Sequence, residues 1–247
     1  MTSRLQDTAK AEDYAFAASL DREQWAWEFL RRNPDYRREW AAFSATWREL
    51  ESLYGSPPNR DFNAWKQDRR AWVPVSECPD GECRVDQDKV LIECALGARW
   101  GFHKFPPDPA DDDPVGAGRL TWRERPLRPI HVVADGEREW LGADPARVGI
   151  GFDLRLPLRE QLEQAKRSLQ MMQRRRRRDG GVVPLSVATC RERWTRCLRL
   201  LDAESGGSAD PALLAALAGD SDLDALRAEA SGLRNRGYLE ILDLPNG

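Results

Sequence analysis

The pattern of apolar and polar positions is clearest between residues 21 and 55, where it predicts two consecutive helices. In the first, Asp21 with Gln24 three residues later matches a capping box, in which each residue satisfies the other's backbone N–H. Four apolar residues then fall on one helical face, namely Trp25, Ala26, Phe29 and Leu30. This helix is expected to end at Arg32.

The second helix is expected to begin at Asn33-Pro34, because Asn is a preferred capping residue and Pro costs nothing at the first helical position. Large apolar residues follow at spacings of four, three, four, three and four: Tyr36, Trp40, Phe43, Trp47, Leu50 and Tyr54. Gly55 then ends the helix. Such a stripe is typical of a buried core face, since large rings bury the most apolar area. The alternative is a platform on which nucleic-acid bases stack.

Short apolar runs separated by Pro, Gly and Asp predict a small β-sheet in the middle of the chain. The run at residues 90–95 is too short for periodicity to decide between a strand and a buried helix. Residues 119–122, 130–134 and 148–152 are strand candidates. Residues 108–118 contain three consecutive aspartates and read as an exposed linker. We therefore expect one domain at residues 1–107 and a second at residues 119–247.

Helices are predicted for most of the C-terminal part. Residues 156–178 carry an amphipathic stripe and end in five arginines and an Asp-Gly-Gly break; the stripe consists of Leu158, Leu162, Ala165, Leu169 and Met172. Further helices are expected at residues 186–203 and 211–218, and after a cap at Ser221 or Asp222. Residues 238–244 either end that last helix or form a strand. The fold class is thus mainly α (α+β), with a Trp-rich N-terminal helical domain, a small central sheet and a C-terminal bundle resembling a helix-turn-helix.

Composition narrows the class of protein. The 247 residues are 41% hydrophobic and 32% charged with a net charge of -3, a globular profile without a global demand for a polyanionic partner. No apolar run approaches the roughly 20 residues of a membrane span, and we expect no signal peptide in the acid-containing first 20 residues. The five cysteines show no framework. Together these features favour a reduced, cytoplasmic compartment.

Basic residues concentrate between Leu154 and Arg199, where thirteen bases against four acids give a local net charge of +9. Clustered arginine is the electrostatic signature of phosphate-backbone binding. The predicted DNA-binding residues are Arg174, Arg175, Arg176, Arg177, Arg178, Arg191, Arg193 and Arg196. The alternative is a solvated helix end, because cations at a helix C-terminus also interact favourably with its dipole.

The three helices predicted between Ser186 and Arg236 are long, short and long, an arrangement compatible with a helix-turn-helix. The presumptive reading helix opens with Asp220, Asp222 and Asp224, which phosphates would repel. The same helices therefore also suit a protein-interaction role.

Catalytic and metal-binding patterns are weak. Cys78, Cys83, Cys94 and His103 could supply four zinc ligands, but they lack the C-x-x-C spacing of structural sites, so free thiols are favoured. The aspartates at 111–113 could bind a divalent ion, although a solvated run is the expected interpretation. No nucleophile, phosphate-loop or dinucleotide motif is present. We predict no enzymatic activity, no metal and no cofactor.

Several of these residues also resemble a known family. The stretch from Trp25 to Trp40 (WAWEFLRRNPDYRREW), with RWGF at 99–102 and Asp108-Pro109, resembles the transcriptional regulator-like domain of proteobacterial proteins. After residues 121–123 the chain resembles a partner domain of unknown function with a helix-turn-helix-like end, through FDLRLPL at 152–158, LRLLDA at 198–203 and GYLEIL at 237–242.

This resemblance implies a bacterial DNA-associated regulator. Similar proteins activate excision and transfer genes of integrative and conjugative elements, and single-domain relatives act as antiactivators by binding the activator. The acidic stretch GDSDLDALRAEA departs from the basic stretch usual in that family. We therefore predict a transcription regulator that binds the DNA backbone and a further regulator protein; the alternative is an interaction factor that does not bind DNA.

Overall fold

The computed structural model describes residues 10–78, 83–124, 148–206, 210–219 and 222–246. These are mainly helical with one small antiparallel sheet, which confirms the predicted fold class. The chain forms two compact units, one of residues 1–124 with 186–247 and one of residues 125–185. The units do not follow the predicted division at residues 108–118, because the C-terminal helices share a core with the N-terminal ones.

The N-terminal helices have the caps that the sequence predicts. A 3-10 helix, η1 (Ala11–Ser19), is followed by α1 (Arg22–Leu30), where Asp21 and Gln24 form the capping box. Asn33 caps α2 (Pro34–Tyr54), with Pro34 in its first turn. Gly55 ends α2 with a φ of 84°, a conformation that favours glycine. Local sequence is sufficient here, because each cap satisfies backbone groups of its own helix.

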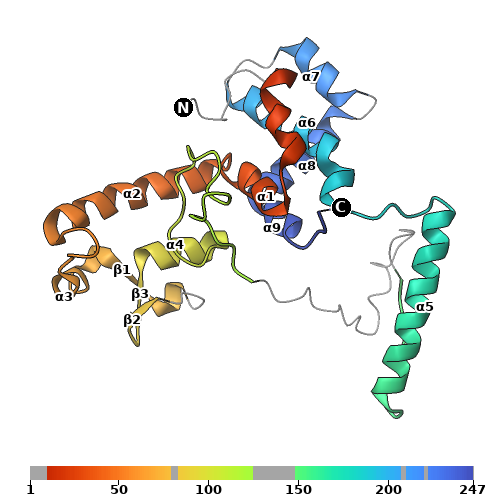
Figure 1. The fold of residues 1–247 in the computed structure, drawn as a ribbon, viewed down its shortest axis with the longest axis horizontal. Helices are drawn as coiled ribbons and strands as arrows, with labels where there is room; N and C mark the ends of the chain where they lie inside the picture. The colour runs from red at the N-terminus through yellow and green to blue at the C-terminus, as the bar shows by residue number, and fades with distance from the viewer. Residues whose placement is uncertain (1–9, 79–82, 125–147, 207–209, 220–221, 247) are drawn as a thin grey trace. The chain divides into compact units, whose positions relative to one another are not determined.

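A small subdomain follows α2 and contains the sheet. Its order is α3 (Phe62–Trp65), η2 (Arg69–Ala71), β1 (Trp72–Pro74), η3 (Val75–Glu77), β2 (Arg84–Asp86), β3 (Lys89–Leu91) and α4 (Ile92–Trp100). The antiparallel strands run in the order β1-β3-β2, with Val73 opposite Val90. The ambiguous run at residues 90–95 is thus the end of a strand followed by the start of a helix. Figure 1 shows α4 running beside α2.

The sheet does not lie where the sequence predicts it. Of the three strand candidates, residues 119–122 form only an isolated bridge between Trp122 and Phe102, and residues 148–152 contain no strand. Residues 130–134 lie outside the described part of the chain. The actual strands are three residues each, too short for an alternating pattern to show in the sequence.

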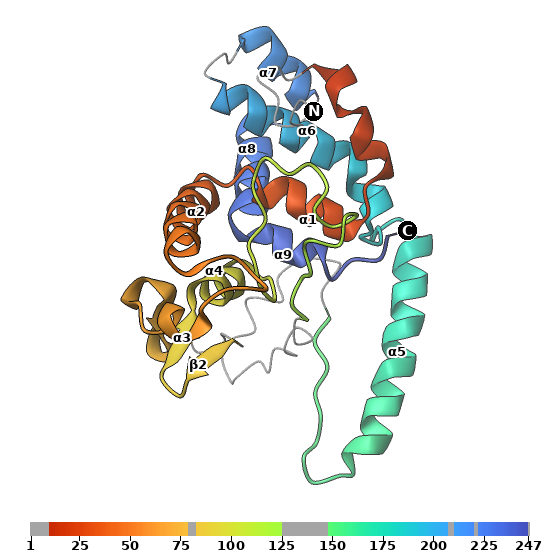
Figure 2. The same cartoon turned by 60° about the vertical axis from the view of Figure 1, so that its left-hand side comes forward.

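The C-terminal helices agree with the predictions. They are α6 (Val187–Ser205), α7 (Pro211–Ala218) and α8 (Leu223–Gly232), followed by a π-helical turn η5 (Leu233–Gly237) and α9 (Tyr238–Ile241). Residues 238–241 are therefore helical rather than a strand. In Figure 2, α9 lies directly beside α1, while α6, α7 and α8 form a cluster of their own.

One large core joins these elements. The ring of Trp194 on α6 meets Trp25 and Phe29 on α1, with centroids 5.3 and 6.4 Å apart. A smaller aromatic cluster surrounds Trp65 in the sheet subdomain. The stripe on α2 divides between the two, since Tyr36 belongs to the large core and Leu50 to the small one. Tyr36 and Leu50 are fully buried, which confirms at these two positions that the aromatic stripe of α2 is a core face.

The second unit is described here by residues 148–185, whose main element is α5 (Leu158–Arg178). Gln161 organises the turn before this helix. Its side chain accepts from the N–H of Asp153 at 2.8 Å and donates to the carbonyl of Asp153 at 2.9 Å. Every residue of α5 is at least partly exposed.

Candidate nucleic-acid interface

The C-terminal end of α5 carries the run of arginines at 174–178, of which all but the half-buried Arg176 are exposed. The side chains of Arg175 and Arg178 are 78% and 79% exposed, and each lies near Asp179 at 3.7 and 3.9 Å. Gly180 ends the helix with a φ of 73°. The terminal carbonyls and the carboxylate favour cations here, but they neutralise only a fraction of five positive charges. Phosphate oxygens could approach this end from several directions.

The arginines on α6 are placed differently. Arg193 pairs with Glu229 on α8. The Nε atoms of Arg191 and Arg196 are buried and find no hydrogen-bond partner in the described part of the chain. Since α6 belongs to the other compact unit, the structure does not unite these side chains with the arginines at 174–178 as one described surface. The net charge counted along the sequence treats Arg193 as available, although it is already paired with Glu229.

The first half of α8, the presumptive reading helix, is engaged in polar contacts within the protein. Asp222 caps its N-terminus by accepting from the N–H of Asp224 at 3.1 Å. Arg227 donates to Glu204 on α6 at 2.8 Å and to Asp224 at 3.1 Å. Glu204 thus links α6 to α8, while Asp222 and Asp224 place two carboxylates at the start of α8. This surface is better suited to a protein than to a phosphate backbone.

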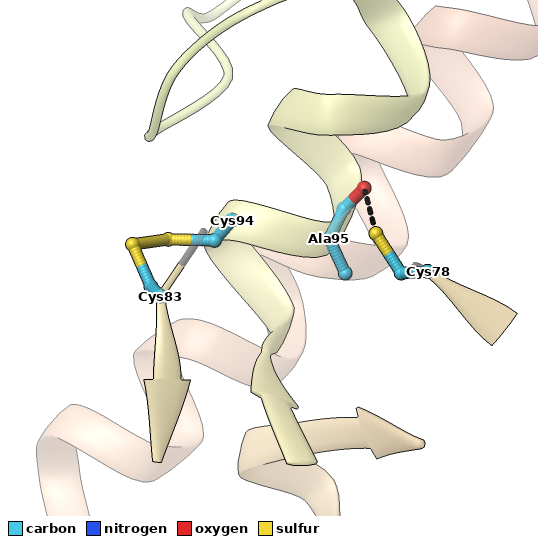
Figure 3. Close-up of a disulfide and its surroundings, with 4 residues drawn as sticks. All are labelled: Cys78, Cys83, Cys94 and Ala95. Atoms are coloured by element: carbon cyan, nitrogen blue, oxygen red, sulfur yellow. Dashed lines mark hydrogen bonds between the residues drawn. A yellow bond between two sulfur atoms is a disulfide. The ribbon is translucent and has the colours of Figure 1, made fainter. Parts of the chain in front are cut away.

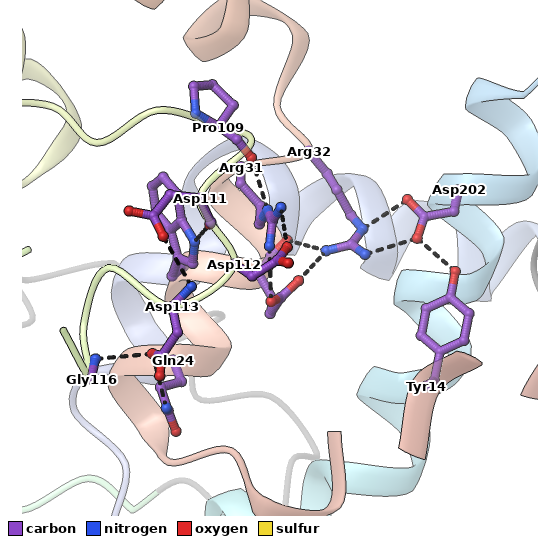
Figure 4. Close-up of polar contacts among 12 residues, drawn as sticks. Tyr14, Gln24, Arg31, Arg32, Pro109, Asp111, Asp112, Asp113, Gly116 and Asp202 are labelled. Atoms are coloured by element: carbon purple, nitrogen blue, oxygen red, sulfur yellow. Dashed lines mark hydrogen bonds and ion pairs between the residues drawn. The ribbon is translucent and has the colours of Figure 1, made fainter. Parts of the chain in front are cut away.

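A buried ionic network connects α1 to α6 (Figure 4). Arg32 donates to both carboxylate oxygens of Asp202 at 2.8 Å, and the Tyr14 hydroxyl donates to the same carboxylate at 2.6 Å. Arg32 also donates to Glu28, which accepts from Arg31 at 3.3 Å. Burial opposes ionisation of Arg32, but the charges of Glu28 and Asp202 outweigh it and raise its pKa. Burial, followed by the charge of Asp202, raises the pKa of Tyr14.

Residues 108–118 are part of this packing rather than a linker or a solvated acidic run. Asp112 accepts from Arg31 at 2.9 Å, and Asp113 accepts from Gln24 at 3.2 Å (Figure 4). The backbone carbonyl of Asp111 accepts from the indole of Trp27 at 2.9 Å. The three aspartates are therefore fixed by α1. In the described part of the chain, no group of three or more acids, cysteines or histidines could hold a metal ion.

Two of the cysteines form a disulfide, so the prediction of free thiols is wrong for them. Cys83 at the start of β2 is bonded to Cys94 on α4 (Figure 3). Two of the four candidate zinc ligands are thereby consumed. Cys78 remains a thiol, and its sulfur donates to the carbonyl of Ala95 at 3.9 Å. Burial, followed by the charge of Glu229, raises the pKa of Cys197 to about 12, the opposite of what a nucleophilic thiol requires.

A groove of about 430 Å³ lies between α2 and α4 in the first unit. Its lining contains both apolar and polar side chains, and some of the polar ones are paired. Glu39, for example, accepts from the indole of Trp100 at 3.0 Å and lies 3.3 Å from Arg99. The lining includes Ala42, Phe43, Val73, Ile92 and Leu96. With apolar residues in its lining and Glu39, Arg70 and Arg99 in ion pairs, this groove suits an apolar side chain of a partner better than a nucleic acid.

Comparison with known proteins gives a match in the N-terminal part. Residues 7–72 match the proteobacterial transcriptional regulator-like domain. This regulator-like domain spans η1 through η2 and ends at the first residue of β1. The match supports a regulatory role for the chain. No curated protein and no solved structure matches it.

The regulator-like domain contributes Tyr14, Glu28, Arg31 and Arg32 to the buried network, whereas Asp202 lies far outside the match. Arg31 and Arg32 belong to the LRRNP stretch noted in the sequence, but the sequence carries no signal that pairs them with residues 112 and 202. None of the helices in the described part of the chain combines the length and apolar character needed to cross a bilayer.

Proposed function

We propose that this chain is a transcription regulator that binds the DNA backbone through the arginines at 174–178, and that it controls excision and transfer genes of a mobile element. The observation that carries the DNA-binding part is the exposure of these side chains at the end of α5. The match of residues 7–72 supports the regulatory part. The target genes rest on the family resemblance of the sequence alone.

Electrostatics explains why this end of α5 fits DNA. The helix itself carries eight basic residues and two acids, and five of the bases form its last turns. Each phosphate neutralised by such a side chain releases a condensed counterion, so affinity should depend strongly on salt. Arg191, Arg193 and Arg196 are expected to contribute less, because Arg193 is paired and the other two are partly buried.

Fluorescence anisotropy with a labelled duplex of random sequence tests this proposal across a salt series. Changing all five arginines to Ala should weaken binding to every sequence and reduce the salt slope by as much as about 4 to 5, at roughly 0.9 per phosphate contact. A variant with five lysines at the same positions keeps the charge and should keep the slope. An Arg38→Ala, Arg48→Ala variant on α2 controls for general loss of positive charge. An unchanged slope in the five-alanine variant would exclude this stretch from the interface.

The second candidate is an interaction factor that regulates through protein partners without binding DNA. The acidic start of α8 and the apolar groove between α2 and α4 favour it. Its test is a pull-down with a purified candidate regulator, comparing the wild type with Phe43→Arg in the groove. A stable complex that the variant loses, together with no duplex binding at low salt, would support this candidate and exclude the first.

A further inference from the structure

The apolar residues of α5 follow the repeat of a coiled coil. Leu158, Leu162, Ala165, Leu169 and Met172 recur at spacings of four, three, four and three. This is the alternation of d and a positions in a heptad, which places all five along one seam of the helix. Arg176 continues the series four residues later. The 21 residues of α5 thus amount to three heptads.

This seam is open to solvent. Leu158, Leu162 and Leu169 are 48%, 52% and 40% exposed. Most helical stability in proteins comes from packing an amphipathic face against another element, and the apolar face of α5 lacks such packing at these leucines. A seam of three leucines, an alanine and a methionine is therefore expected to be covered in the functional protein.

We propose that α5 pairs in parallel with α5 of a second copy of this chain. The seam is self-complementary, since a repeat of four and three is the spacing at which two identical helices interlock knobs into holes. The flanking positions agree with a parallel pair. There, Gln161 faces Lys166 of the other copy and Ser168 faces Gln173, so like charges meet only at the arginine end of the pair. An antiparallel pair would instead bring Arg159 opposite Lys166.

The parallel arrangement has a consequence for DNA binding, and this part rests on the proposed function. It brings two sets of five arginines to the same end of the pair. Their mutual repulsion weakens the pair at low salt, and phosphates between them would relieve it. Pairing and DNA binding should therefore strengthen each other, whereas neither a single copy nor an antiparallel pair would gather ten arginines at one place.

Sedimentation velocity of the full chain tests the pairing without DNA. At about 1 M salt, where the screening length falls to about 3 Å, the arginines no longer repel and the wild type should dimerise as its concentration is raised. Leu162→Gln with Leu169→Gln should remain monomeric, and Met171→Gln should behave as the wild type, because Met171 lies beside the seam and is 67% exposed. Far-ultraviolet circular dichroism, which reports helix content, shows whether each variant keeps its helices, since α5 contains no tryptophan. A wild type that stays monomeric at every salt, or a seam variant that dimerises equally well, would overturn the proposal.

Cysteine crosslinking tests the orientation. Met172→Cys should form an intermolecular disulfide on mild oxidation in a parallel pair, whereas Met171→Cys, one residue away, should not exceed the unsubstituted protein. Crosslinking at neither or at both positions contradicts the parallel seam.

Duplex binding separates this inference from the proposed function. With a duplex at low salt, the seam variant should bind at least about tenfold more weakly, because linked sites gain effective concentration. If the protein dimerises at high salt but binds no duplex, the pairing is supported and DNA binding is excluded. If the seam variant is monomeric and binds the duplex as tightly as the wild type, the pairing is excluded and DNA binding is supported. Seam-dependent binding of a monomer to anionic vesicles would assign the seam to a lipid surface and overturn the pairing.

Discussion

The guanidinium of Arg32, in the turn between α1 and α2, binds the carboxylate of Asp202 on α6 through two hydrogen bonds of 2.8 Å. The two residues are 170 positions apart in the sequence, and both are 4% exposed. Bidentate pairs of this kind fix orientation as well as distance. This contact joins the regulator-like domain to the C-terminal helices.

Removing one partner of this pair should destabilise the fold. Arg32→Ala removes both guanidinium hydrogen bonds from the buried Asp202 carboxylate, and breaking a buried pair in this way typically costs about 3–5 kcal/mol. Urea unfolding followed by circular dichroism measures the change. Arg38→Ala is the control, since Arg38 pairs with Asp35 on the surface and should change stability by less than about 1 kcal/mol. Equal losses for the two variants would contradict a structural role of the network.

Glu93 should make the stability of the protein fall as pH rises. Burial raises the pKa of this carboxyl from 4.5 to about 7, and its Oε2 makes no hydrogen bond in the described part of the chain. Between these two values the folded state holds a proton that the unfolded state has lost. The stability is therefore complete below pH 4.5 and declines through pH 7, by about 3 kcal/mol in total.

The variant Glu93→Gln should abolish this decline and be more stable than the wild type at pH 8. Urea unfolding at a series of pH values gives the comparison. Glu49→Gln is the matched control, because the side chain of Glu49 is 65% exposed. A wild-type profile that does not fall between pH 4.5 and 7 relative to Glu93→Gln would refute the assignment.

Gly97 should not tolerate a side chain. A Cβ at this position of α4 would lie 2.0 Å from the carbonyl oxygen of Lys104, so the backbone must move to admit it. Overpacking of this kind typically costs about 1–3 kcal/mol. Thermal unfolding of Gly97→Ala measures the loss. Gly232→Ala serves as the control, since its Cβ meets nothing within 4 Å and the variant should be no less stable than the wild type.

The disulfide between Cys83 and Cys94 predicts a thiol count of three before reduction and five after it, measured in the denatured protein. Reduction should also lower stability by about 2–3 kcal/mol, as expected for a bond that closes a short loop. Cys78→Ser should leave the sensitivity to reductant unchanged. Five titratable thiols in the unreduced protein would show that the bond does not form.

Much of the fold is predictable from local sequence. Asp21, Asn33 and Gly55 mark helix ends because caps act within one turn, and those ends are where the structure places them. The position of the sheet could not be predicted, because its three-residue strands are shorter than the alternating pattern that identifies a strand. Tyr14 precedes the first helix that the pattern predicts, yet it is buried, because its hydroxyl donates to Asp202, 188 residues later in the chain.

The candidate interface is predictable only in part. The arginines at 174–178 form a run, so the sequence alone shows their density. The pairing of Arg193 with Glu229 depends on how α6 meets α8, which no spacing along the chain reveals. The same limitation explains why the aspartates at 111–113 resemble a linker. Their partners Gln24 and Arg31 come from a helix more than 80 residues earlier.

The first compact unit is assembled from two stretches of chain that enclose a third, residues 125–185. Both stretches contribute to its core. Contacts between rings such as Trp25 and Trp194, and the buried charged side chains around Arg32, hold the two stretches together. A protease cut between Glu124 and Ser186 would leave both pieces bound to each other. Residues 1–124 and 186–247, produced as separate polypeptides, should associate in solution. The segment between them is therefore a suitable position for splitting the protein into a two-part reporter or for inserting a foreign domain.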